Sequence, residues 1–231
     1  MLYALRHPVA LAALAVGFVL AAAVHVVARA ALARATGQLA ALPEGRRPFD
    51  LRQQLDPFGV VALLLAGVGW VHPLRTPGRW RARRGRRIGL ALSGSLANLV
   101  VGCAGFIGYR AMAGGQLASL AANVELKAQL QGSLVAVTTA EQFLLALALA
   151  NLATGVLALV PIPPLEGSDV LFTLAPPNHG WQRARYYLAE QNWGVALVGL
   201  LLLLPIAGNE PPLLSLLGSL LRPLLAALAN L

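Results

Sequence analysis

The stretch PVALAALAVGFVLAAAVHVVA, residues 8–28, decides the fold class of this chain. It is apolar throughout except for His25, and a helix needs roughly 20 such residues to cross the hydrocarbon layer of a bilayer. Two further runs, residues 88–109 and 143–160, have the same character, with only scattered Ser, Thr and Asn. Because helices satisfy their backbone hydrogen bonds internally, they suit a lipid solvent. The sequence therefore predicts an all-α integral membrane protein.

The composition of the whole chain agrees with this prediction. Of 231 residues, 58% are hydrophobic and 12% are charged, whereas a soluble domain carries about a quarter charged residues. The first apolar run exceeds the usual core of a signal peptide, roughly 7–15 residues, so we expect a retained anchor rather than a cleaved signal. The single cysteine, Cys103, lies within the second run and is expected to be a small packing residue.

The net charge of +9 comes largely from one short connector between apolar segments. Seven arginines crowd this connector: Arg75, Arg79, Arg81, Arg83, Arg84, Arg86 and Arg87. Such a cluster predicts that the loop 75–87 is cytoplasmic in a multi-pass protein of the cell (plasma) membrane, where it could also contact anionic lipid headgroups. No aromatic-interleaved basic face accompanies the cluster, which argues against a nucleic-acid partner.

The remaining segments are shorter or more polar. Residues 58–71 form an apolar run too short for a full span, and basic segments flank it on both sides, so we expect a re-entrant or hairpin element. The polar connector 34–56 could hold a short strand or hairpin, and the loop 110–141 is expected on the external side. Residues 193–207 and 213–231 are two spans or a shallow hairpin. We expect a membrane core over 1–175 and a separate C-terminal hydrophobic region over 176–231.

Placing an ionisable or polar group within the membrane costs free energy, so such groups usually have a functional role or a pairing partner. Three places qualify: His25 with Arg29, then Asn98, then Glu166 with Asp169. The first and third spans are expected to end on the same side of the membrane, so their polar ends could meet. Positions 25 and 29 also share one face of a helix, the spacing that a His-Glu-x-x-His zinc site uses. Here the first ligand is present, but the catalytic base and the second ligand are absent.

Several motifs resemble those of the site-2 protease family of intramembrane zinc metalloproteases, particularly its short bacterial members. The sequence PIPPLEGS, residues 161–168, resembles the family's Pro-x-Pro-Pro-Leu-Asp-Gly element. His25 stands where the His-Glu-x-x-His helix belongs, and LDPFG, residues 55–59, is similar to Asp-Pro-Leu-Gly. Gly69-Trp70 followed by Pro73 resembles Gly-Trp-Ala-Lys-Pro, and SGSLAN, residues 93–98, resembles Ala-Gly-Pro-Leu-Ser-Asn. The resemblance covers roughly residues 5–175.

The resemblance implies a site-2-protease-like helical core, a zinc site at His25 and Glu166, and a substrate-contacting role for Asn98. The departures from the family pattern imply that this site is degenerate. Val26 stands at the position of the catalytic Glu and cannot polarise water, and Arg29 stands at the second His and cannot bind a cation. Asp169 could supply a further oxygen. We hypothesise that a guanidinium–carboxylate pair between Arg29 and Glu166 replaces the metal, with His25 as a hydrogen-bonding neighbour.

These observations favour a catalytically inactive pseudoprotease that needs no cofactor and binds or regulates transmembrane segments of other proteins within the lipid bilayer. Two alternatives stay open: an active zinc metalloprotease with an atypical ligand set, and a small transporter or channel component. Asn98 could instead only bridge helices, and Asp56 is expected to cap a helix or turn before Pro57. His72 and His179 are expected to be solvated in loops, although either could complete a rearranged metal site.

Overall fold

The computed structural model describes residues 7–37, 55–71, 84–206 and 210–231. Within these ranges the regular elements are helical, apart from one isolated antiparallel bridge. Four helices are long and apolar enough to cross a membrane: α1 (Pro8–Ala35), α4 (Arg84–Ala113), α7 (Thr139–Ala158) and α11 (Pro212–Ala229). The expectation of an all-helical, multi-pass membrane protein is confirmed at this level.

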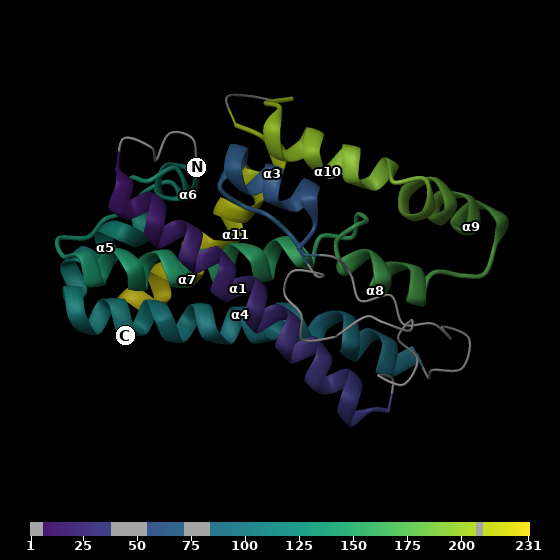
Figure 1. The fold of residues 1–231 in the computed structure, drawn as a ribbon, viewed down its shortest axis with the longest axis horizontal. Helices are drawn as coiled ribbons and strands as arrows, with labels where there is room; N and C mark the ends of the chain where they lie inside the picture. The colour runs from purple at the N-terminus through teal and green to yellow at the C-terminus, as the bar shows by residue number, and fades with distance from the viewer. Residues whose placement is uncertain (1–6, 38–54, 72–83, 207–209) are drawn as a thin grey trace.

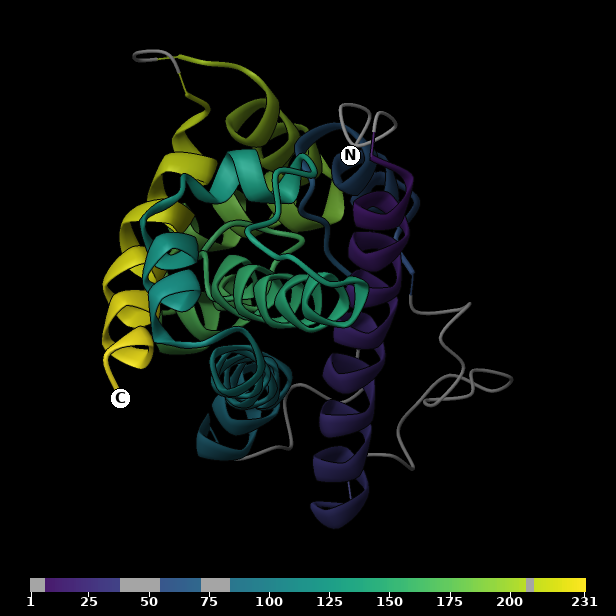
Figure 2. The same ribbon diagram turned by 90° about the vertical axis from the view of Figure 1, so that its left-hand side faces the viewer.

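Helix α7 lies at the centre of the molecule, with α1 and α4 packed against it (Figures 1 and 2). Small residues allow the three helices to approach closely. Such close packing is usual in a bilayer, where the hydrophobic effect does not drive helices together. A Cβ atom on Gly17 of α1 would lie 2.9 Å from the backbone oxygen of Ala146 in α7. On α4, a Cβ on Gly102 would lie 2.6 Å from Leu152 Cγ. Gly102, Gly105 and Gly108 of α4 therefore form a contact face against α7.

The short element after α1 turns back on itself. Asp56 caps the start of α3 (Pro57–Ala66), because its side chain accepts hydrogen bonds from the first backbone N–H groups of the helix. The helix ends at Gly67, whose φ of +83° is one that glycine adopts easily. Leu55 and Val71 then pair as an antiparallel bridge. The apolar run 58–71 is therefore a helix followed by a return segment, whereas most of the connector 34–56 lies outside the described residues.

Two short helices, which the sequence did not predict, occupy the connector between α4 and α7. They are α5 (Gly115–Asn123) and α6 (Leu126–Leu130). Helix α11 packs against both of them, and in Figure 1 it crosses behind the end of the bundle where α4 finishes. This arrangement closes the end of the three-helix core that is farther from the start of α4.

Past α7 the chain forms α8 (Gly167–Leu174), α9 (His179–Arg185), the π-helical turn η3 (Tyr186–Glu190) and α10 (Trp193–Leu203). Helix α10 has 11 residues, fewer than the roughly 17–25 that a spanning helix requires. It packs against α3. The last hydrophobic region thus contains one helix of spanning length, α11, preceded by a shorter apolar helix.

Candidate functional site

Two side chains of α1 meet a carboxylate that follows α7. His25 and Arg29 lie one turn apart on the same helix and are 1% and 2% exposed. Glu166 precedes the first residue of α8 and is 3% exposed. Its Oε1 atom accepts a hydrogen bond from His25 Nε2 at 2.9 Å and another from Arg29 Nη1 at 2.5 Å. The structure therefore joins α1 to the start of α8 through one buried oxygen.

A third helix contributes to the same cluster through Asn98 of α4, which is fully buried. Its Nδ2 atom lies 3.2 Å from His25 Nδ1. A carboxylate oxygen such as that of Glu166 only accepts hydrogen bonds, so the other ring nitrogen, Nε2, carries a proton. Both nitrogens of the imidazole are therefore engaged by protein groups, and the ring is held from α4 and from the start of α8.

The charges in the cluster keep Glu166 ionised. Burial raises the pKa of its carboxyl group, but the neighbouring His25 and Arg29 outweigh burial and hold that pKa below its usual range. A buried carboxylate needs such partners, since an unpaired charge away from water is strongly disfavoured. The contacts of Glu166 with His25 and Arg29 thus connect α1 to the start of α8 and also stabilise the charged form of Glu166.

The backbone of α4 approaches the imidazole at Gly94. A Cβ atom at this position would lie 2.5 Å from His25 Nε2, closer than any side chain tolerates. Gly94 therefore leaves the space in which the ring reaches Glu166. The sequence motif around this glycine was visible, but its contact with His25 required the packing of α1 against α4 to be known.

The position next to His25 carries no acid–base group. Val26 is 4% exposed and packs with Ala22, Val71 and Leu55 in one apolar cluster. A general base must lie within hydrogen-bond reach of the proton that it removes, and a valine side chain cannot accept one. The contact between Val26 and Val71 instead links α1 to the segment that returns after α3.

Three buried polar atoms around the cluster have no hydrogen-bond partner among the described residues: Arg29 Nε, Ser95 Oγ and Asn98 Oδ1. Ser95 and Asn98 lie one turn apart on α4 and are fully buried. Buried polar atoms of native proteins are generally paired with protein or water. These three atoms are therefore the places where water, or a polar group of a bound segment, would find a partner.

The structure also places the other residues singled out in the sequence, except for one that lies outside the described ranges. Asp169 is half-buried in the first turn of α8, where its backbone N–H donates to Glu166 O at 2.9 Å. Among the described residues it belongs to no group of three potential metal ligands. Asp56 caps α3, as described above. His179 is exposed, as expected, but it is the first residue of α9 and not part of a loop. His72 lies outside the described residues.

The zinc centre that the family resemblance implies does not fit these residues. A catalytic zinc ion takes three protein ligands, but no group of three His, Cys, Asp or Glu side chains gathers anywhere in the described part of the chain. The carboxylate that would face the metal is instead bonded to Arg29, whose guanidinium is permanently charged and binds no cation.

Comparisons with known proteins give one informative similarity. The chain is 28% identical over 155 residues to "Putative zinc metalloprotease YwhC" of Bacillus subtilis (strain 168). The alignment covers 67% of this chain and 65% of the relative, so the chain spans slightly less than two thirds of that protein's length. No family model matches the chain, and no solved structure matches it. The similarity links the chain to a named metalloprotease, although its own cluster lacks a three-ligand set.

Proposed function

We propose that this chain is a site-2-protease-like membrane protein in which an ion pair has replaced the zinc centre, leaving a catalytically inactive pseudoprotease. The observation that carries the proposal is the 2.5 Å hydrogen bond from Arg29 Nη1 to Glu166 Oε1 inside the protein. In an active relative a dication would balance the motif's carboxylate. Here the guanidinium supplies the balancing charge and links the same two elements.

The surroundings of the pair support the same conclusion. Val26 has an apolar environment instead of a place for a water-activating carboxylate. His25 has both ring nitrogens engaged by Glu166 and Asn98. Hydrolysis of a peptide bond by a metalloprotease requires a metal-bound water and a base to activate it. The described residues form neither a three-ligand metal site nor a base beside His25.

The proposed role is the binding or regulation of transmembrane segments of other proteins. The unpaired Ser95 Oγ and Asn98 Oδ1 atoms offer hydrogen bonds to a polar or backbone group that enters from the bilayer, where unsatisfied groups are costly. Such a role needs recognition of the segment but no chemistry on it.

An active intramembrane metalloprotease with an atypical ligand set is the second candidate, and the name of the Bacillus subtilis relative favours it. The two functions are separated by incubating the purified full-length protein with a model transmembrane substrate, with and without a chelator. We expect no chelator-sensitive cleavage. A cleavage product that disappears with chelator and returns with added zinc would overturn the pseudoprotease proposal.

A further inference from the structure

The segment that follows α8 has a basic and aromatic surface that takes no part in the cluster around Glu166. Helix α9 and the π-helical turn η3 expose five side chains: His179, Gln182, Arg183, Tyr186 and Tyr187. Their spacing of three and four positions places them along one stripe of the helix. We call these five side chains the exposed stripe.

The opposite side of this segment packs against the protein. The ring of Trp181 meets the ring of Phe172 in α8 edge to face, with centroids 6.2 Å apart. At the start of α10, a Cβ atom on Gly194 would lie 2.2 Å from the backbone oxygen of Pro163, so glycine allows the chain to lie against the loop before Glu166. Because these contacts fix the inner side, the exposed stripe has a defined direction relative to the core.

The segment is positively charged. Arg183 and Arg185 lie in α9, and no acidic residue occurs between positions 170 and 189; Glu190 ends η3. Arg183 lies over the ring of Tyr187, with Cζ 5.9 Å from the ring centroid, and makes no ion pair among the described residues. A guanidinium stacked on a ring keeps its N–H groups at its edge, where they match the oxygens of a phosphate.

Further basic residues lie at the same end of the molecule. Arg84 and Arg86 are exposed at the start of α4, and α4 packs against α8, the helix that leads into α9. Figure 1 shows the start of α4, α8 and α9 toward one end of the structure. The arginine-rich sequence that precedes α4 predicts that this end is cytoplasmic, where the anionic surface of the leaflet attracts basic segments.

Along the chain, the exposed residues change from basic to aromatic to apolar. Tyr186 and Tyr187 follow the arginines of α9, and Trp193, which is 64% exposed, begins α10. Helix α10 contains no charged residue, and its exposed side chains include Leu197 and Leu200. Tyrosine and tryptophan favour the membrane interface, and leucine favours the acyl chains. The order from α9 to α10 is that of a segment that enters a bilayer from its surface.

We propose that the exposed stripe of α9 and η3 binds the headgroups of anionic phospholipids, with α10 in the acyl-chain region beside it. Arg183 binds the phosphate group, and Tyr186 and Tyr187 pack at the level of the ester groups. A zwitterionic choline headgroup would bring its own positive charge beside the arginines, whereas an anionic headgroup brings none. The occupant is therefore a lipid surface rich in anionic headgroups, such as those of phosphatidylglycerol.

The test measures which lipids reach two positions of the full-length protein in nanodiscs. Cys103, the single cysteine, is replaced by Ala, and a fluorescent probe is attached at Gln182→Cys in the exposed stripe or at Leu200→Cys in α10. Spin-labelled lipids quench a probe that they contact. A label near the headgroup end of the acyl chain should quench the probe at position 182 more than a label at the chain terminus does. The opposite order is expected at position 200.

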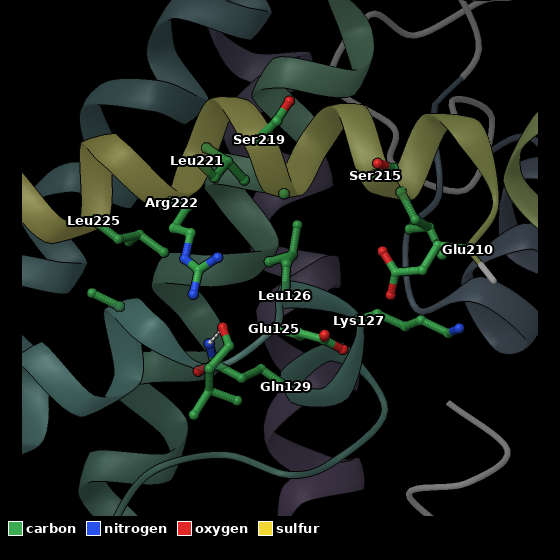
Figure 3. A pocket seen from close by; sticks show the side chains of 14 residues that line it. Glu125, Leu126, Lys127, Gln129, Glu210, Ser215, Ser219, Leu221, Arg222 and Leu225 are labelled. Carbon is green, nitrogen blue, oxygen red and sulfur yellow. Dashed lines mark hydrogen bonds between the residues drawn. The ribbon is translucent and has the colours of Figure 1, made fainter. Parts of the chain in front are cut away.

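The preference for anionic lipid is measured with the probe at position 182. At equal content in the membrane, spin-labelled phosphatidylglycerol should quench this probe about fivefold more strongly than spin-labelled phosphatidylcholine, as expected for one basic residue at a membrane surface. Arg183→Gln should remove most of this difference, and Arg183→Lys, which keeps the charge, should retain it. Lys127→Gln is the matched control. It removes the same charge from α6, which lies at the opposite end of the molecule from α9 in Figure 1 and lines a pocket beside α11 (Figure 3).

Several results would overturn the proposal. Equal quenching at position 182 by the two lipids, or a preference that persists in Arg183→Gln, would show that Arg183 selects no anionic headgroup. Stronger quenching at that position by the chain-terminus label would place the exposed stripe in the hydrocarbon layer. A probe at position 182 that neither lipid quenches would show that water or another protein covers the stripe.

Discussion

Arg29 and Glu166, separated by 137 positions in the chain, are joined by a 2.5 Å hydrogen bond between Nη1 and Oε1 in the interior of the protein. His25 donates to the same oxygen. One carboxylate oxygen therefore connects the first long helix to the polar segment that follows α7. The following predictions start from this contact.

Removing either partner of the pair should destabilise the protein. Glu166→Gln and Arg29→Ala each leave a buried polar or charged group without its partner, which costs about 3–5 kcal/mol for buried pairs. The measurement is the thermal unfolding of the detergent-solubilised protein. The double variant Arg29→Met/Glu166→Leu, which removes both charges and keeps side-chain volume, should be more stable than either single variant. Two single variants with wild-type stability would show that the pair has no structural role.

Gly94→Ala should disturb the cluster without touching a charged residue. The new Cβ atom would lie 2.5 Å from His25 Nε2, so the ring must move away from Glu166, at a cost of about 1–3 kcal/mol. Gly89→Ala is the matched control, because Gly89 lies in the same helix and no atom of the described residues lies within 4 Å of its Cβ position. We expect the control to be neutral or slightly stabilising, since Ala favours helix more than Gly does. Equal melting temperatures for the two variants would contradict the contact.

The packing of α1 on α7 makes a separate prediction at Gly17. A Cβ atom there would lie 2.9 Å from a backbone oxygen of α7, and a backbone atom cannot swing aside as a side chain can. Gly17→Leu should therefore separate the helices and lower the unfolding temperature more than Gly17→Ala does. Gly218→Leu in α11 provides the comparison, because no atom in the described part of the chain lies within 4 Å of the Cβ position of Gly218. A harmless Gly17→Leu would be inconsistent with the described interface.

Much of the fold could be predicted from sequence because lipid imposes a simple rule on helix length and polarity. The three apolar runs correspond to α1, α4 and α7, and the short run after α1 is too short to span and instead folds back. Helices α5 and α6 were not predicted, since such short segments are marginal as helices on their own and these two pack against neighbouring helices, including the distant α11.

The candidate site likewise has residues that the sequence predicts and contacts that it does not. His25, Arg29 and Glu166 could be singled out because ionisable residues beside membrane spans are rare, and the expected topology put them at similar depth. The fit of Gly94 against the imidazole and the unpaired Ser95 Oγ depend on how α4 is rotated relative to α1. Periodicity does not specify that rotation when apolar residues surround the whole helix.

The metal content of the protein gives the most direct test of the central claim, that Arg29 has taken the place of a metal at Glu166. The wild-type protein and the variant Val26→Glu/Arg29→His/Glu166→Asp, which adds one ligand and a base and shortens the existing carboxylate, should be purified with zinc present and analysed for metal. We expect well below about 0.1 zinc per chain for the wild type and close to about one for the variant, as for a three-ligand site. Close to one zinc per wild-type chain, lost on replacing His25, would contradict the account.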